Sequence, residues 1–380
     1  MSKIITSTLE KICLQEKGSI ISGPFGSNIS SKYFVDKGVP VIRGNNLSLS
    51  FDKFYDKDFV FVTKQKADEL KCYAYRDDLI FTAAGTIGQV GIIPKNSLYS
   101  EYVISNKQIR ARIDTNKVDL LYAYYWFSSS WIKEILIRSN KGSTVPLLTL
   151  NEIRDLPILY PEDINEQRKI ANTIERFSQK IEVNNRINDN LQQMAHTTYM
   201  HLFFGKKTNG KLEDILVENP KSAIQVGEAK DIDGEYPFFT SGDAVLRWCE
   251  PLVDGRNCFL NTGGNADVKF YVGKTAYSTD TWCISAKNDL SDYLYLLLKS
   301  IKPELNQKFF QGTGLKHLQK PLLKERPIYI PSEEEAKTFN NSVQPWFTMI
   351  SDNIRESQRL TALRDWLLPM LMNGQATISE

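Results

Sequence analysis

The sequence predicts an α+β protein in which two similar globular segments are each followed by a long α-helix. Three observations lead to this fold class: an internal repeat of long period, short β-rich runs with few helices in each copy, and a heptad pattern after each copy. The chain has 380 residues, of which 42% are hydrophobic and 24% are charged. This length and composition are typical of a folded chain with two or three domains.

The internal repeat is clearest at two pairs of prolines. Pro157 and Pro161 recur as Pro327 and Pro331, each 170 positions later, and similar residues surround both pairs. A repeat of this length indicates that the chain contains one structural unit twice.

Two further segments repeat at slightly different distances. The segment 81–90 aligns with 259–268 at an offset of 178, and the tyrosine-rich segment 119–127 aligns with 292–300 at an offset of 173. We interpret the change in offset as a difference in loop length between the two copies.

Each globular segment contains short runs of β-branched and aromatic residues that are separated by glycine, asparagine and aspartate. These runs are 39–42, 79–82 and 90–93 in the first copy and 236–239, 258–260 and 269–272 in the second. One helix is expected in each copy, at 120–137 and at 293–300. Strands followed by a single helix predict an α+β domain that is used twice.

The segments after Pro161 and Pro331 have apolar or small residues at alternating steps of four and three, which is a heptad seam. We expect two helices of roughly 40 residues, or about 60 Å each at 1.5 Å per residue. The predicted seam residues are Ile174, Phe177, Ile181, Asn184 and Leu191 in the first helix, and Trp346, Ile350, Asn353, Leu360 and Leu367 in the second.

The two seams are polar at the same level, where Asn184 corresponds to Asn353. A seam asparagine lowers stability but fixes register, so we expect Asn184 and Asn353 to pair if the two helices pack on one another. The alternative is that one or both face solvent. Pro345 is expected to start the second helix or to kink it.

The net charge is only +2, from 47 basic and 45 acidic residues, so any nucleic-acid surface would have to be a local patch. The sequence has no run of about 18 apolar residues and no apolar segment typical of a secretory signal, and we expect a cytoplasmic protein. The five cysteines form no CxxC pair, which favours reduced thiols, and the three histidines are not spaced as metal ligands. We therefore expect no metal site.

Motifs for several classes of enzyme are absent from the sequence. It has no GxxxxGK[ST] phosphate loop, no GxGxxG fingerprint, no GxSxG elbow and no Pro-Pro pair of the kind found in amino-methyltransferases. We therefore expect no catalytic residues. The glycines within 84–88 and 262–265 could contact phosphate, but strand turns are the favoured interpretation because no helix begins after them.

Loops rich in glycine, serine, asparagine and basic residues form a candidate recognition surface. Arg43 could bond a guanine edge through two donors and Asn45 an adenine edge, while Lys141 and Lys316 would suit contacts to phosphate. For each residue the alternative is a solvated loop side chain. The candidate DNA-binding residues are Ser27, Asn28, Arg43, Asn45, Asn46, Lys141, Ser143, Thr240, Ser241, Arg247, Asn265 and Lys316.

One motif occurs in both copies: Gly-Ser or Gly-Thr, a leucine, a short helix, Leu-Pro-Ile or Arg-Pro-Ile, a second proline and the heptad helix. The first heptad helix opens with Glu-Gln-Arg-Lys-Ile-Ala at 166–171. The motif resembles that of the specificity subunit of type I restriction-modification systems, and the segment 20–27 resembles the start of a target recognition domain in that family. The resemblance covers essentially the whole chain, although Glu335-Ala336-Lys337 replaces Glu-Gln-Arg in the second copy.

The resemblance implies two target recognition domains, at 1–161 and 205–331, separated by two long antiparallel helices at 162–204 and 332–380 that form a coiled coil. Each domain would read one half of a bipartite, asymmetric DNA site, and the helix pair would set the spacer and dock two methyltransferase subunits. S-adenosylmethionine would bind to these partners, and ATP and Mg²⁺ would act in restriction subunits, so this chain would need no cofactor. The complex would modify double-stranded DNA in phage defence, and no membrane would be among its partners.

Two alternatives stay open on the residues alone. The chain could be the recognition component of a related modification or phage-defence complex, or a non-catalytic coiled-coil scaffold with two adaptor lobes. A scaffold would show no sequence preference on DNA, whereas a reader that neutralises phosphates would bind with steep salt dependence.

Overall fold

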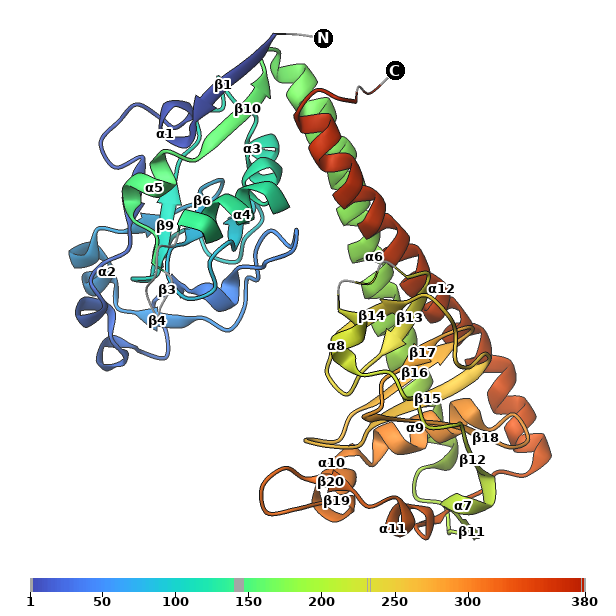
Figure 1. Cartoon of the computed structure of the whole chain (residues 1–380). Coiled ribbons are helices and arrows are strands. Elements are labelled where there is room, and N and C mark those ends of the chain that lie inside the picture. Colours follow the sequence, from blue (N-terminus) through green and yellow to red (C-terminus); the bar gives the residue numbers. More distant parts are fainter. Residues whose placement is uncertain (1–2, 140–146, 231, 233, 377, 379–380) are drawn as a thin grey trace. The chain divides into compact units, whose positions relative to one another are not determined.

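The structure is a computed structural model, and it describes residues 3–139, 147–230, 232, 234–376 and 378. The chain divides into two compact units: unit 1 contains Met1–Lys180 and Leu360–Glu380, and unit 2 contains Ile181–Arg359. Each unit holds one globular lobe and parts of two long helices (Figure 1). Lobe 1 is residues 3–161 and lobe 2 is residues 205–331.

Lobe 1 contains two four-stranded sheets. The first is antiparallel with the order β2-β9-β6-β7, and the second has the order β4-β3-β8-β5, in which β3 and β8 are parallel. The strands are β2 Ile20–Ser22, β3 Val39–Ile42, β4 Val60–Val62, β5 Tyr73–Ala74, β6 Leu79–Thr82, β7 Val90–Ile92, β8 Tyr102–Ile104 and β9 Gln108–Ala111. Alternate residues of β6 face two cores, since Phe81 packs on the helical side and Ile80 packs among residues of the second sheet.

Short helices and one further strand pair complete lobe 1. They are α1 Leu9–Ile12, α2 Lys64–Leu70, α3 Leu120–Phe127, α4 Ser130–Ser139, α5 Leu150–Arg154, β1 Ile4–Thr8 and β10 Pro157–Pro161. Helix α3 begins after Asp119, whose carboxylate accepts the backbone N–H groups of Leu121 and Tyr122. Its residues from Tyr122 to Phe127 are all buried, so this aromatic helix forms much of the core.

Lobe 2 repeats this plan with sheets of order β12-β18-β15-β16 and β14-β13-β17, and β13 and β17 again form the parallel pair. Its strands are β11 Gly210–Lys211, β12 Leu216–Glu218, β13 Tyr236–Phe239, β14 Val245–Trp248, β15 Arg256–Asn261, β16 Val268–Val272, β17 Ala276–Tyr277, β18 Thr281–Ala286, β19 Phe310–Gln311, β20 His317–Leu318 and β21 Pro327–Ile328. Its helices are α7 Leu212–Ile215, α8 Val226–Ala229, α9 Ser291–Ser300, α10 Lys302–Glu304 and α11 Lys320–Lys324. The predicted α+β class with an internal repeat is confirmed.

The structure corrects the alignment of the first repeated strand by one residue. Phe81 pairs with Ile109 in lobe 1, and Leu260 pairs with Trp282 in lobe 2. Phe81 and Leu260 both lie in the core that contains the helix, whereas Phe259 lies in a different core. The equivalent of Phe81 is therefore Leu260, because a shift of one residue turns a strand side chain to the other face.

The repeated helix is also shifted from the predicted alignment, by two residues. The hydroxyl of Tyr122 in α3 donates to the carbonyl oxygen of Leu159 in β10, and the hydroxyl of Tyr293 in α9 donates to that of Tyr329. Leu159 and Tyr329 follow the matched prolines by the same two positions. Tyr122 thus corresponds to Tyr293, at an offset of 171 rather than 173.

The two long helices are α6 Ile164–Phe203 and α12 Glu333–Met372, with 40 residues each. At the start of α12, the Ser332 hydroxyl accepts the N–H of Glu335, and the Glu335 carboxylate accepts the N–H of Ser332 at 2.9 Å. Pro345 lies within this helix, so the prediction that it starts the helix is wrong. The turns before Pro345 are held by burial of Phe339 and Val343 in the core of unit 2.

In unit 2 the two helices lie side by side and antiparallel (Figure 1). The Asn184 amide donates to the Glu356 carboxylate at 2.7 Å and to the Ser357 hydroxyl at 3.3 Å, and the Asn353 amide donates to Asn188 Oδ1 at 2.8 Å. The predicted Asn184–Asn353 pair is therefore wrong. The two helices run in opposite directions, so higher residue numbers on one helix lie opposite lower numbers on the other. Asn184 therefore lies opposite Ser357, one helical turn after Asn353.

Burial of the predicted seam varies along the helices. Ile174, Asn184 and Ile350 are buried. The half-buried members are Phe177, Ile181, Leu191, Trp346, Asn353, Leu360 and Leu367. Among the described residues, neither these helices nor any other is both long enough and apolar enough to span a membrane.

Candidate nucleic-acid interface

Three loops of lobe 1 surround one polar pocket of about 320 Å³. They follow β3, β6 and β8, whose ends the sheet register brings close together. Arg43, Asn45, Thr86, Asn106 and Lys107 line the pocket, together with backbone of the same loops. The structure thus brings together the two predicted base-reading residues, Arg43 and Asn45.

Asn46 holds the first of these loops from within the protein. Its side chain is fully buried, accepts the N–H of Arg43 at 3.0 Å and donates to the carbonyl oxygens of Tyr55 and Lys57 at 3.0 and 2.9 Å. The prediction that Asn46 contacts DNA is therefore corrected: its hydrogen-bonding groups are used inside the lobe, and its role is structural.

Gln89 is a second buried side chain that bonds to the same loop. Its amide nitrogen donates to the carbonyl oxygens of Gly44 and Leu47, both at 3.0 Å, and its amide oxygen accepts the Thr82 hydroxyl at 3.0 Å. Both Gln89 and Thr82 are buried. Because these bonds end on main-chain atoms, they fix the path of the loop that carries Arg43.

Arg43 is half-buried and lines this pocket. Its Nε atom is buried and has no hydrogen-bond partner among the described residues. The described lining of the pocket contains no carboxylate. Asn45 uses its amide nitrogen on the carbonyl oxygen of Asp58, at 3.2 Å. The pocket is therefore rich in donors and suits a ligand that presents acceptors.

Ser27 and Asn28 are exposed on a loop beside this pocket. The loop comes close because Gly23 has no side chain: a Cβ there would lie 1.8 Å from the carbonyl oxygen of Ser105. A Cβ at Gly26 would lie 3.2 Å from the amide nitrogen of Asn106. Two predicted contact residues thus lie on a loop that packs against the pocket loop 105–108.

In lobe 2 the equivalent loops carry different groups. In lobe 1, the N–H of Ser105 after β8 donates to the carbonyl oxygen of Ile42 at the end of β3. In lobe 2, the N–H of Ser278 after β17 donates to the carbonyl oxygen of Phe239 at the end of β13. Both N···O distances are 2.9 Å. By this match Arg43 corresponds to Thr240, and Lys107 corresponds to Asp280. The basic positions of lobe 1 are therefore neutral or acidic in lobe 2.

Thr240 was predicted to contact DNA, but the structure places it away from the surface. It is buried, and its hydroxyl accepts the N–H of Gly242 at 3.2 Å within a tight turn. The Lys269 ammonium donates to the carbonyl oxygens of Thr240, at 3.0 Å, and Gly242. Burial lowers the pKa of Lys269. Ser241 is half-buried on this turn, and Thr240 is part of its support rather than a contact residue.

The other predicted residues of lobe 2 lie on separate elements. Asn265 and Lys316 are exposed, and their loops are joined by a bond of 2.9 Å from the N–H of Gly264 to the carbonyl oxygen of Lys316. Arg247 is half-buried on β14. Lys141 and Ser143 lie outside the described residues.

Sequence reasoning missed Thr86, Gln89, Asn106 and Lys107. Thr86 falls in the glycine segment that was interpreted as a strand turn, and Asn106 and Lys107 carry no motif. The available signal was the match between the segments after β8 and β17, which pairs Ser-Asn-Lys-Gln at 105–108 with Ser-Thr-Asp-Thr at 278–281.

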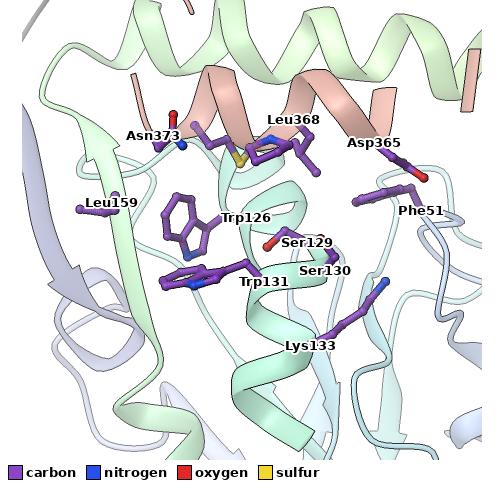
Figure 2. A pocket seen from close by; sticks show the side chains of 12 residues that line it. Phe51, Trp126, Ser129, Ser130, Trp131, Lys133, Leu159, Asp365, Leu368 and Asn373 are labelled. Carbon is purple, nitrogen blue, oxygen red and sulfur yellow. The ribbon is translucent and has the colours of Figure 1, made fainter. Parts of the chain in front are cut away.

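A second pocket of unit 1 is apolar and has a volume of about 330 Å³. Figure 2 shows Trp126 and Trp131 next to one another in its wall; their ring centroids are 5.4 Å apart. Leu368 of α12 also lines it, and Lys133 and Asp365 are its charged groups. Burial lowers the pKa of Lys133. This wall offers few donors to phosphates or base edges, so the pocket around Arg43 is the better candidate.

No group of three or more His, Cys, Asp or Glu side chains in the described part of the chain is placed to hold a metal ion. All five cysteines are free, and four of them are buried. The lining of the pocket around Arg43 offers hydrogen-bonding groups and positive charge, which are means of binding a nucleic acid.

The fold and the site define a protein with two lobes of one topology and differently charged loops. The chain matches the family described as the type I restriction modification DNA specificity domain over residues 7–193 and 206–343, which together include most of its length. It therefore belongs to the type I restriction-modification DNA specificity family.

Two curated relatives are similar over most of their length. The type I restriction enzyme MjaIX specificity subunit of Methanocaldococcus jannaschii is 24% identical, with 80% of this chain and 78% of that protein covered. The MjaVIII specificity subunit of the same organism is 21% identical, with 73% and 75% covered. The crystal structure of the type I restriction-modification system S subunit from M. genitalium has the same fold, with a TM-score of 0.62 at 14% identity over 100% of this chain and 97% of that one.

Proposed function

We propose that this chain is the non-catalytic DNA-reading subunit of a type I restriction-modification enzyme, and that each lobe reads one half of a bipartite, asymmetric site. One observation supports this function best. The first sheets of the two lobes share a strand order and the second sheets share a parallel pair, yet equivalent loops carry Arg43 and Lys107 in lobe 1 but Thr240 and Asp280 in lobe 2. Donors and acceptors recognise different base edges, so two such lobes suit two different half-sites.

The helix pair would set the distance between the half-sites and dock two methyltransferase subunits. In unit 2 the internal repeat relates positions 184 and 188 to positions 353 and 357. The bond between Asn184 and Ser357 therefore corresponds to the bond between Asn353 and Asn188. This pseudo-twofold relation presents similar surfaces twice, which suits two copies of one partner.

The chemistry of the complex would belong to the partners. S-adenosylmethionine would bind to the methyltransferase subunits, and ATP and Mg²⁺ would act in restriction subunits, so this chain would need no cofactor. We place the complex in the cytoplasm, where it would modify double-stranded DNA in phage defence. A related modification or phage-defence complex would differ in its partners and not in the role of this chain.

The test is to co-express the full chain with its methyltransferase partner, mix the complex with random duplex DNA and sequence the retained fraction at two salt concentrations. We expect two short motifs at a fixed spacing, and retention that falls steeply with salt. The methyltransferase without this chain is the control and should retain no such motif.

Replacement of residues 1–161 by the corresponding lobe of a relative should change one motif and leave the other. If the complex is stable but retains no motif, the chain is a scaffold with adaptor lobes and the proposed function is wrong.

A further inference from the structure

Arg43 differs from the other arginines of the lobe 1 sheets in its partners. Arg112 pairs with the buried Asp78 at 3.1 Å, and Arg110 lies 3.7 Å from the same carboxylate. The buried Nε atoms of Arg43 and Arg110 both lack a hydrogen-bond partner among the described residues, but only Arg110 lies close to a carboxylate. What distinguishes Arg43 is that it lines a pocket whose described walls contain no carboxylate, so its positive charge is available to a ligand.

The main chain at Arg43 is fixed before any ligand arrives. The Asn46 side chain accepts the N–H of Arg43, and Gln89 donates to the carbonyl oxygen of the next residue, Gly44. Both side chains are buried and bonded on more than one side. These bonds hold the main chain that carries Arg43, so the loop itself needs little ordering on binding.

The pocket is arranged with one planar donor inside and flexible groups at its edge. Arg43 is half-buried, whereas Asn45, Thr86, Asn106 and Lys107 are exposed. A guanidinium presents N–H donors as a rigid fork, and guanine is the base whose major-groove edge presents two acceptors, N7 and O6. A Lys side chain at the edge acts as a point charge and suits a phosphate.

We propose that Arg43 reads a guanine in the half-site of lobe 1, that Gln89 is a positioning residue for it, and that Lys107 contacts the DNA backbone. This inference rests on the proposed function. The equivalent positions in lobe 2, Thr240 and Asp280, supply no guanidinium or ammonium group, so guanine reading through this site is confined to lobe 1.

The experiment uses the full chain with its methyltransferase partner and random duplex DNA, and it compares base preference position by position. Arg43→Ala should lower the preference for guanine at one position of one motif by about 5- to 150-fold and leave the second motif unchanged. Arg43→Lys keeps the charge without the fork, so it should hold overall retention near that of the wild type while it loses the guanine preference.

Two further variants separate the roles. Gln89→Glu keeps the acceptor for Thr82 but loses both N–H donors to the loop, and it should weaken the same guanine preference. Lys107→Ala should weaken binding to all sequences and reduce the slope of log affinity against log salt by about 1, with base preference unchanged. Arg138→Ala is the control, because Arg138 is exposed and bonds to Glu134 on its own helix.

The outcomes distinguish this inference from the proposed function. If the wild type selects two motifs and Arg43→Ala leaves both unchanged, the guanine assignment is wrong. A uniform loss of affinity with no change in base preference makes Arg43 a phosphate contact, which also overturns it. If the wild type selects no motif, the proposed function itself has failed.

Discussion

At the scale of single residues, a short ion pair of lobe 2 joins Arg256 on β15 to Asp292 on α9. Two parallel contacts of 2.6 Å link the guanidinium to the carboxylate, which is fully buried. Arg256 also donates to the carbonyl oxygen of Gln344 and the hydroxyl of Thr348 on α12. One side chain therefore connects a strand, a lobe helix and a long helix of unit 2.

Arg256→Ala should destabilise the protein by about 3 kcal/mol or more, because removal of one partner leaves a buried carboxylate without compensation. Urea denaturation of the full chain measures this loss. The control is Arg256→Met with Asp292→Leu, which removes both charges and should recover most of the stability. If the single and double variants lose the same amount, the ion pair is not the cause.

The same variant has an expected pH dependence. Burial raises the pKa of Asp292 above its ordinary value, and the bond from Arg256 opposes this effect. Without Arg256 the folded state binds the proton more tightly than the unfolded state, so the variant should gain stability relative to the wild type as pH falls from 8 to 5. A constant difference across this range would contradict the assignment.

Which polar residues are free for contacts could not be predicted from residue type alone. Arg43 and Asn45 line a pocket, but Asn46 and Thr240, from the same kind of loop, are buried. Their burial depends on partners far along the chain, such as the carbonyl oxygens of Tyr55 and Lys57 for Asn46. A local pattern contains no information on such contacts.

At the scale of elements, the polar bonds between α6 and α12 suit a single register. Asn188→Leu removes the acceptor of the Asn353 amide and should cost about 1–2 kcal/mol, because a partly buried donor loses its partner. The double variant with leucine at 188 and 353 should be at least as stable as the wild type, since an apolar seam is more stable than a polar one. Thermal unfolding of both variants measures the difference.

An unchanged melting temperature in the single variant would mean that this bond contributes nothing to stability. A double variant less stable than the single one would indicate that the seam cannot accommodate two leucines.

The long helices were the elements best predicted from the sequence. Their expected ranges, 162–204 and 332–380, can be compared with Ile164–Phe203 and Glu333–Met372. A heptad pattern that extends along a helix of 40 residues is a strong signal. The residue opposite each seam position was not predictable, because a single helix pattern does not contain the register of its partner. The expectation that Pro345 starts the helix was wrong because tertiary packing stabilises the turns that precede it.

At the scale of the whole chain, the thiols should differ strongly in reactivity. Cys249 is exposed, whereas Cys13, Cys72, Cys258 and Cys283 are buried. Burial raises the pKa of Cys13 and Cys283 to about 12 and that of Cys72 to about 11, so these groups stay protonated at neutral pH. The thiolate is the nucleophile, and buried thiols are inert.

Brief treatment of the native chain with iodoacetamide should therefore modify Cys249 alone, as measured by mass spectrometry of its peptides. The same treatment in urea is the control and should modify all five cysteines. Rapid modification of Cys72 in the native chain would show that the core of lobe 1 opens readily.

The repeat could be recognised from the sequence, but its exact equivalences required the structure. Offsets of 179 for β6 and β15 and 171 for α3 and α9 follow from paired strands and hydrogen bonds and not from similar letters. The two copies differ so much in sequence that the alignment of similar residues is displaced by one or two positions from the alignment of structurally equivalent residues.

The support under the Arg43 loop has a consequence for how this protein can change over time. Gln89 bonds to main-chain oxygens of Gly44 and Leu47, which every residue type provides. Mutations at 43 or 45 can therefore alter what the loop binds while the bonds from Gln89 that hold the loop are kept. Under the proposed function, single mutations that keep the protein stable would change the DNA preference of lobe 1, and a lineage would alter its target without new partner subunits.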